Sequence, residues 1–279
     1  MASPQDRNAD AVSQAQLLAE AAEAVPVRQA SLWGDAWRRL LKNKLAVIGL
    51  VTVIILGLLA IFAPLLAPYG PAEVVSPDLR LMKPSWYFPL GLDQNGRDMF
   101  SRMLYGARVS FQVGFVSVGL AGTAGPLLGL IAGHHRGRGD SIIVMIADVI
   151  FAFPAVLLAI AIITMAGNSL RNAMIAIAIV VMPTFVRIVR GAVLSVRETT
   201  YVEAAVSVGA STPRIMARHI FPNVTAPLIV HASLIFASAV LSEAALSFLG
   251  LGNKPPSPSW GSMVSGSYGY LQQAPWAAI

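Results

Sequence analysis

The sequence predicts an all-α protein embedded in a membrane. Hydrophobic residues make up 56% of the 279 residues and charged residues only 12%, whereas about 25% of an ordinary soluble domain is charged. The mean hydropathy is correspondingly high, at +0.66. Several apolar runs reach roughly 20 residues, the length at which a helix crosses the hydrocarbon core of a bilayer. Lipid is therefore the main solvent that this fold requires.

Positive charge flanks the apolar runs. The formal net charge is +6 and the isoelectric point is about 10.0, values that on their own also suit a protein that binds nucleic acid. The position of the charges beside apolar segments indicates membrane orientation instead, so we expect a lipid bilayer and no nucleic acid as partner. The chain has no cysteine, which excludes disulfides and thiolate chemistry.

Two segments precede the first long apolar run. Residues 1–30 are polar and alanine-rich, so we expect a flexible cytoplasmic tail with no cleavable signal peptide. Residues 31–44 interleave tryptophan and leucine with arginine and lysine, which predicts an interfacial amphipathic helix in the headgroup layer.

The membrane domain is expected at residues 45–279, with five visible transmembrane helices. The apolar segments are 45–67, 111–133, 141–165, 173–191 and 224–249. Residues 68–110 are polar and rich in turn residues, which predicts a small extracytoplasmic cap. Another apolar run begins at Trp276, so we expect a sixth helix that is missing or cut at the C-terminus.

Arginine and lysine set the orientation of these segments. They concentrate before residue 45, at 134–140 and at 187–218, which lie on one side of successive crossings. The short loops on the other side hold only Arg171 and Lys254. The positive-inside rule therefore predicts a cytoplasmic N-terminus and a cytoplasmic loop at 195–223.

Glycines repeat along the second apolar segment. Gly125, Gly129 and Gly133 are spaced four residues apart and share one helix face. Because glycine at this spacing lets two backbones approach closely in lipid, we expect this segment to pack against another helix.

The loop at 195–223 has the most informative local pattern. Thr200 followed by Glu203 matches a capping box, which predicts a helix that begins at Tyr201. Gly209 is placed to end this helix in the left-handed conformation. A second short helix should start near Pro213 and end at Pro222. Alone, this pattern suits a docking helix and an ordinary loop equally well.

The loop also resembles a known family. Glu203-Ala204-Ala205, Gly209 and Ile220-Phe221-Pro222 are similar to the EAA loop of the membrane subunits of bacterial ATP-binding-cassette importers. Residues 89–110, which include Gly91-Leu92-Asp93-Gln94-Asn95-Gly96-Arg97-Asp98, resemble the extracytoplasmic signature of the C-type permease of dipeptide and oligopeptide importers. Further similar stretches are Asp148 with 152–154, and 243–252 before Pro255-Pro256. The resemblance covers residues 32–279.

The resemblance implies a type I importer bundle and the partners that go with it. It implies a heterodimer with a homologous permease, two ATPase subunits or one fused ATPase, and an extracytoplasmic solute-binding protein, in the bacterial cytoplasmic (inner) membrane. Each permease forms half of the translocation pathway for peptides or related small solutes. The residues implied in ATPase coupling are Tyr201, Glu203, Ala204, Ala205, Gly209, Ala210 and Ser211. Those of the extracytoplasmic motif are Gly91, Asp93, Gly96, Arg97 and Asp98.

The sequence departs from the family in places that concern the solute. The family usually has histidine where Phe88 stands and threonine or serine at Leu92, and often has aromatic residues at His134 and His135. These changes leave the architecture in place and weaken any inference about which solute is carried.

No residues suggest catalysis in this chain. It lacks a Gly-x-x-x-x-Gly-Lys-Ser/Thr phosphate loop and a converging nucleophile, base and orienting group, so we expect no cofactor here, with ATP and magnesium bound by partner subunits. The pair His134-His135 has no third ligand nearby, which favours a solvated loop and no metal.

Two acidic residues leave alternatives open. Asp148 and Glu243 lie in apolar segments, where charge is costly. They suit neutral or hydrogen-bonded carboxyls near helix ends, or the ion-coupling carboxylates of a secondary transporter. Arg187 and Arg190, near a cytoplasmic helix end, suit interface anchors. A scaffold or receptor-like membrane subunit without transport is a third interpretation.

Overall fold

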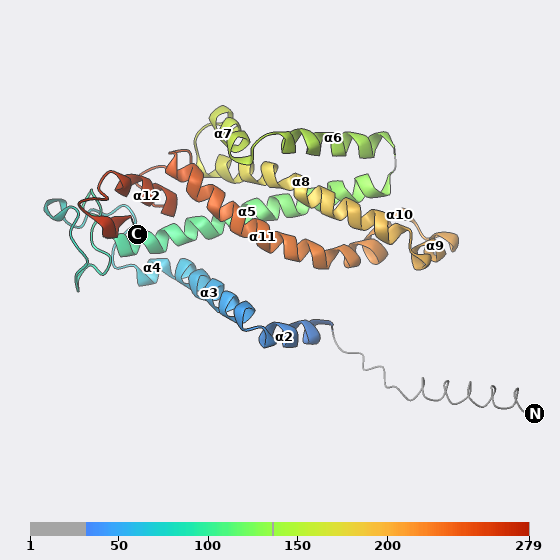
Figure 1. Ribbon diagram of the computed structural model, residues 1–279, viewed down its shortest axis with the longest axis horizontal. Coiled ribbons are helices and arrows are strands. Elements are labelled where there is room, and N and C mark those ends of the chain that lie inside the picture. Colours follow the sequence, from blue (N-terminus) through green and yellow to red (C-terminus); the bar gives the residue numbers. More distant parts are fainter. Residues whose placement is uncertain (1–31, 136, 279) are drawn as a thin grey trace, which may run out of the picture. The chain divides into compact units, whose positions relative to one another are not determined.

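The structure is a computed structural model that describes residues 32–135 and 137–278 (Figure 1). The tail predicted at residues 1–30 lies outside the described residues. The described part of the chain is helical and has no strand beyond one isolated bridge between Leu92 and Asp98. The predicted all-α class is confirmed. The chain divides into two compact units, residues 1–54 and 55–279.

The first unit holds α2 (Leu32–Lys42) and most of α3 (Lys44–Ile61). Asn43 separates them, and its side-chain oxygen accepts hydrogen bonds from the backbone N–H groups of Leu45 and Ala46 at 3.1 and 3.3 Å. These bonds satisfy two of the N–H groups that a helix start leaves without intrahelical partners. Trp37 and Leu41 of α2 are exposed in the chain alone, as expected of apolar side chains that an amphipathic helix would place against lipid.

Four helices of the described residues are long and apolar enough to cross a membrane. They are α3 and three helices of the second unit: α5 (Met99–His134), α8 (Leu170–Arg197) and α11 (Phe221–Phe248). The helices α6 (Arg138–Ala152) and α7 (Ala155–Ala166) are together long and apolar enough for a fifth crossing, but they meet at a bend of 98°. They form either one broken span or a re-entrant loop.

The bend corrects the prediction of one helix at 141–165. Phe153 has extended backbone, with φ −95° and ψ 140°, and Pro154 follows it. A residue before proline is disfavoured in the helical region because the proline ring clashes with it, so α6 ends there.

The start of α5 corrects the boundary of the cap. Residues 99–110, predicted within the cap, form the first turns of α5, whose N-cap is Asp98. The side chain of Asp98 accepts a hydrogen bond from the backbone N–H of Ser101 at 2.8 Å. Polar residues in these turns, such as Arg102, lower the local hydropathy. A prediction from hydropathy alone therefore assigned them to the cap.

The core of the second unit lies where α5, α8 and α11 run side by side (Figure 1). On α5, Gly125, Gly129 and Gly133 face α8. A Cβ at Gly129 would lie 2.7 Å from the backbone oxygen of Val186, and a Cβ at Gly125 would lie 2.6 Å from the Cβ of Phe185. Only glycine allows the two backbones to come this close.

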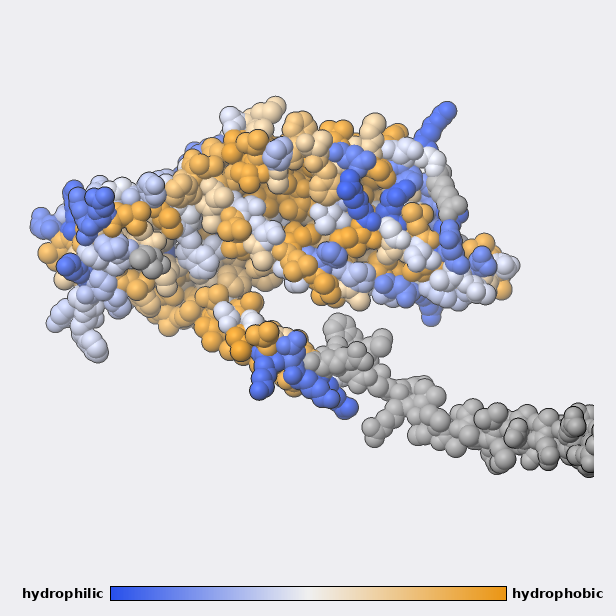
Figure 2. All heavy atoms as spheres, viewed as in Figure 1, coloured by the Kyte–Doolittle hydropathy of each residue, from blue (hydrophilic) through white to orange (hydrophobic). Residues whose placement is uncertain are grey.

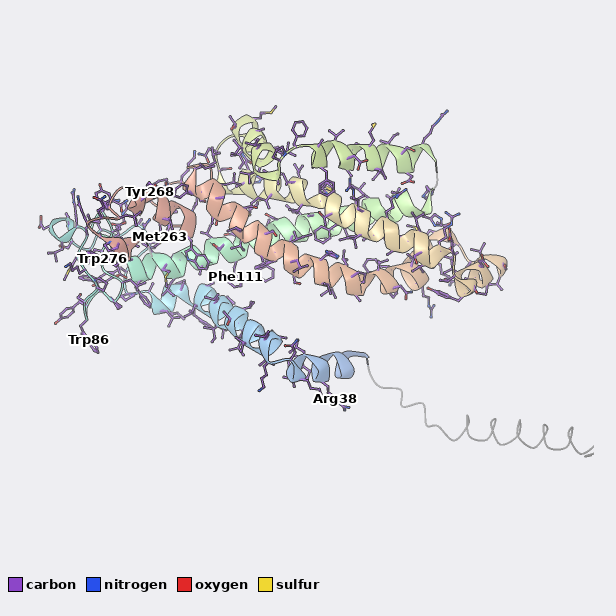
Figure 3. All side chains as sticks on the ribbon, viewed as in Figure 1. Arg38, Trp86, Phe111, Met263, Tyr268 and Trp276 are labelled. Carbon is purple, nitrogen blue, oxygen red and sulfur yellow. The ribbon has the colours of Figure 1, made fainter. Side chains whose placement is uncertain are left out.

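A cap closes one end of this unit. It contains the 3₁₀ turns η1 (Pro77–Leu79) and η3 (Pro275–Ala277) and the helix α12 (Trp260–Tyr268), and the short helix α4 (Ala63–Leu66), which precedes it in the chain, contacts α5. Met99, Ala274 and Ala277 form its buried core, and Met263 and Trp276 pack on them. Figure 3 shows Trp276 and Met263 inside the cap and Trp86 pointing away from it.

The surface of the second unit follows this arrangement. Figure 2 shows apolar residues over the middle of the visible face and hydrophilic residues toward the cap and, at the other end, toward α9 (Thr200–Ser207) and α10 (Thr212–Ile215). This distribution suits a bundle whose middle lies in hydrocarbon and whose ends lie in water.

Candidate functional site

The loop that joins α8 to α11, residues 198–220, lies at the end of the bundle away from the cap (Figure 1). We call it the α8–α11 loop. It contains α9 (Thr200–Ser207), the single turn α10 (Thr212–Ile215) and the π-helical turn η2 (Met216–Ile220). All of the residues implied in ATPase coupling lie within it.

The start of α9 corrects the predicted capping box. The N-cap is Thr199, one residue earlier than predicted, and its side chain makes no capping bond to the helix. The hydroxyl of Thr199 instead donates to the backbone oxygen of Val196 at 2.6 Å, at the end of α8. The threonine therefore ties α9 to the helix before it, and Thr200 is the first helical residue.

The end of α9 forms a Schellman motif around Gly209. The backbone N–H of Gly209 donates to the oxygen of Val206 at 2.9 Å, and that of Ala210 donates to the oxygen of Ala205 at 3.0 Å. Gly209 has φ +79°, the left-handed conformation predicted for it. No atom lies within 4 Å of where its Cβ would be, so conformation, and not space, is what requires glycine here.

The second predicted helix does not end at Pro222. From Thr212 the chain passes through α10 and η2 directly into α11, which begins at Phe221 and has Pro222 in its first turn. Proline is tolerated there because its missing N–H would lack an intrahelical partner in any case. The loop is thus continuous with a membrane-spanning helix at its C-terminal side.

A buried cluster anchors the loop to the bundle. Val202 of α9 and Ile215 of α10 pack with Ile220, Val193 of α8 and Val224 of α11, and all five are buried. The guanidinium of Arg197 also donates to the backbone oxygen of His134 at 3.0 Å, which joins the ends of α8 and α5. Because a close-packed core transmits displacement, movement of α9 would be passed to these helices.

The outward side of the loop combines apolar, acidic and small residues. Val206 and Val208 are exposed at 58% and 84%, and Tyr201 at 45%. Glu203, Ala204, Gly209 and Ser211 are also exposed, whereas Ala205 and Ala210 are half-buried. A hollow of about 720 Å³ adjoins α9 and is lined in part by Glu203, Ser207 and Thr212. The sequence did not predict that Val206 and Val208 are exposed, because valine in a short helix is usually a core residue.

The motif predicted to be extracytoplasmic holds the cap together. Asp93 is buried, and one of its carboxylate oxygens accepts the backbone N–H groups of Asn95 at 2.7 Å and Arg97 at 2.9 Å. Its other oxygen lies 3.6 Å from the guanidinium of Arg102, which also donates to the backbone oxygens of Pro71 and Pro256. This network joins the chain before α5 to the chain after α11.

The two glycines of this motif occupy positions that exclude a side chain. Gly91 and Gly96 have φ +75° and +74°. A Cβ at Gly91 would lie 2.4 Å from the backbone oxygen of Met82, and one at Gly96 would lie 2.1 Å from that of Ser76. The motif thus fixes a compact turn before Asp98, the N-cap residue of α5.

The two membrane carboxylates belong to separate networks. Glu243 on α11 is fully buried and accepts a hydrogen bond from the hydroxyl of Ser247 at 2.6 Å. Asp148 on α6 is half-exposed and pairs with Arg187 on α8 at 2.5 Å. The rings of His134 and His135 are 5.1 Å apart, and within the described ranges no group of three or more histidine, aspartate or glutamate residues could hold a metal ion.

Two family matches cover most of the chain. Residues 125–279 match the family described as the binding-protein-dependent transport system inner membrane component. Residues 31–84 match the N-terminal transmembrane domain of oligopeptide transport permease C. The first match begins within α5 and includes the whole α8–α11 loop.

Curated relatives extend over nearly the whole chain. The dipeptide transport system permease protein DppC of Alkalihalophilus pseudofirmus is 49% identical over 89% of this chain and 82% of its own length. The di/tripeptide transport system permease protein DppC of Pseudomonas aeruginosa is 43% identical over 87% and 82%. The glutathione transport system permease protein GsiD of Pectobacterium atrosepticum is 40% identical over 88% and 82%.

These matches agree with the type I bundle that the resemblance implied and give no support to the secondary transporter. The chain therefore belongs to the inner-membrane components of binding-protein-dependent transport systems, as a C-type permease of the peptide ATP-binding-cassette importers.

Proposed function

We propose that this chain is a permease subunit of an ATP-driven importer of short peptides, and that its α8–α11 loop docks on the ATPase. The observation that supports this most directly is the construction of the loop. Its inner side is buried in a hydrophobic cluster shared by α8 and α11, while its outer side exposes Val206, Val208 and Tyr201. Exposed apolar residues beside small ones are typical of a surface that a partner covers.

Coupling requires that the docked helix be joined rigidly to the helices that line the pathway. The Thr199 bond to Val196 and the packing of Val202 and Ile215 supply that connection. When the ATPase subunits close on ATP, α9 moves with them and shifts α8 and α11. Because a ligand shifts an equilibrium only through differential affinity, the α9 contact must differ between the inward-open and outward-open states.

Short peptides are the solute class that the relatives support. The three relatives above are named for dipeptides, di- and tripeptides, and glutathione, which is itself a short peptide. An extracytoplasmic binding protein would deliver the peptide to the cap, and a homologous permease would supply the other half of the pathway.

The proposed orientation has the N-terminus and the α8–α11 loop in the cytoplasm and the cap outside. The arginines of the loop and the arginine and lysine residues of α2 support it by the positive-inside rule. ATP and magnesium would bind to the partner subunits, and this chain would not hydrolyse ATP.

Reversal of the charge on α9 tests the proposal. The complete complex, with Glu203→Arg in this chain, is reconstituted in proteoliposomes, and dipeptide uptake is measured together with ATP hydrolysis. We expect uptake per ATP to fall at least about tenfold while the chain stays in the membrane, since misplaced charge at an interface costs several kcal/mol. Glu203→Asp, which keeps the negative charge at the same position, is the matched control and should leave the ratio nearly unchanged. Normal coupling in Glu203→Arg would contradict the proposal.

A further inference from the structure

Two ion pairs join α6 to α8 within the membrane-spanning part of the second unit. Arg190 donates from two guanidinium nitrogens to the two carboxylate oxygens of Asp140, at 2.6 and 2.7 Å. Arg187 pairs with Asp148 at 2.5 Å and lies over the ring of Phe151, 4.3 Å from its centre. We call these two pairs the α6–α8 charge ladder.

The ladder opens into a cavity. A hollow of about 610 Å³ is lined by Asp140, Asp148 and Arg190, together with Ser141, Met145 and Val149. Asp148 and Arg187 are exposed at 54% and 53%, and only one oxygen of Asp148 has a hydrogen-bond partner among the described residues. Figure 2 shows hydrophilic residues between α6 and α8 in an otherwise mostly apolar surface. Charged groups of both signs are thus accessible in one recess.

Such a recess cannot face lipid at low cost. Charged side chains in membrane helices face a water-filled cavity or another protein, because hydrocarbon does not solvate them. Helix α6 has two distinct faces: Asp140, Val144 and Asp148 follow each other at intervals of four on one, and the exposed Ile142 and Ile146 lie on the other. The isoleucine face suits lipid, and the ladder face suits water.

The distance between the two ion pairs matches the length of a short peptide. Asp140 and Asp148 are eight residues apart on α6, which places them about 12 Å apart along the helix axis. An extended tripeptide spans about 10 Å. A peptide with free termini carries an ammonium and a carboxylate group, and the ladder offers a carboxylate and a guanidinium to meet them.

We propose that the α6–α8 charge ladder lines the solute pathway and binds the charged termini of the transported peptide. This rests on the proposed function and identifies the part of the chain that contacts the solute. A terminal ammonium pairs with Asp148 and a terminal carboxylate with Arg190, and each contact replaces an ion pair that the chain makes with itself. The released Arg187 and Asp140 remain beside the water of the recess, and both ion pairs reform when the peptide leaves.

Thiol labelling tests this, since the chain has no cysteine of its own. Val144→Cys and Met145→Cys place single thiols in the recess without removing a charge, and Ile146→Cys is a control on the isoleucine face at a depth between the two carboxylates. In the chain alone Met145 and Ile146 are exposed and Val144 is half-buried. The complete complex, with cysteine-free partners, is treated in inside-out vesicles with a charged, membrane-impermeant methanethiosulfonate, and uptake by the unaltered complex is measured in parallel.

We expect Val144→Cys and Met145→Cys to react at least about tenfold faster than Ile146→Cys, because a charged reagent does not enter hydrocarbon. A tripeptide with free termini should slow both reactions, and adding Asp148→Asn should raise the tripeptide concentration that halves the rate by about tenfold, the loss of one charge-assisted contact.

Three results would overturn the inference. Rates equal to that of Ile146→Cys place the ladder away from water. Fast rates that the tripeptide leaves unchanged place it away from the solute. Absence of labelling, together with disulfide formation once a single cysteine is introduced into the partner permease, makes it a subunit interface. Failure of the unaltered complex to take up peptide contradicts the proposed function itself, so the two failures are distinguishable.

Discussion

Gly129 gives the sharpest test of how α5 packs on α8. A Cβ at this position would lie 2.7 Å from the backbone oxygen of Val186 and 2.9 Å from the Cβ of Val189. Neither atom belongs to the flexible end of a side chain, so Gly129→Ala forces the two helices apart by several tenths of an ångström. Overpacking of this kind costs about 1–3 kcal/mol.

The matched control is Gly119→Ala on the same helix, where no atom lies within 4 Å of the added Cβ. Alanine there should be neutral or stabilising by up to about 1 kcal/mol, because it favours the helix. The assay is thermal unfolding of the purified chain in detergent, followed by tryptophan fluorescence.

For a chain of this size about 2–4 °C of Tm corresponds to 1 kcal/mol. Gly129→Ala should therefore lower the Tm by about 2–12 °C, and Gly119→Ala should leave it unchanged or raise it. Equal Tm values for the two variants would refute the close approach of α5 and α8.

Three further predictions concern single contacts. Asp98→Ala removes the cap of α5 and should cost about 0.5–2 kcal/mol, whereas Asp98→Ser should keep most of the stability, as measured by Tm in detergent. Gly209→Ala places a Cβ on a residue with φ +79° without a clash, so it should cost about 1–2 kcal/mol, measured as faster hydrogen exchange in α9 and not elsewhere. Glu243→Gln keeps an oxygen to accept the Ser247 hydroxyl and should destabilise the chain less than Glu243→Ala, which leaves a cavity and an unpaired hydroxyl; equal Tm values would contradict this.

The sequence predicts the membrane helices well because hydropathy reports which residues lie in lipid. The predicted segments 173–191 and 224–249 fall within α8 and largely within α11. Hydropathy does not report backbone geometry, so it missed the break at Pro154 and the polar first turns of α5. Both depend on local rules of proline and capping, which a hydropathy window averages out.

The sequence predicted where the residues of the candidate site lie better than it predicted the contacts that they make. Gly209 has the left-handed conformation that its place after a short helix indicates. The capping box failed because Thr199 bonds back to α8, a tertiary choice between two neighbouring threonines that local pattern does not decide. Asp93 is predicted as part of a motif, but its buried partner Arg102 comes from the folding of the cap.

The missed pairs of Arg187 and Arg190 show the same limit. Their partners Asp148 and Asp140 are 39 and 50 residues away in sequence. Helical spacing identifies neighbours within one helix and does not identify which two helices lie together.

Contact between α9 and an ATPase subunit is the central claim, and site-directed cross-linking tests it most directly. Ala204→Cys is labelled with a benzophenone maleimide in the complete complex, and the adduct formed on illumination is identified by mass spectrometry; Ala72→Cys on the cap is the control. The account predicts that Ala204→Cys cross-links to the ATPase subunit and Ala72→Cys does not. A cross-link from Ala204→Cys to the extracytoplasmic binding protein, or to no other subunit, would contradict it.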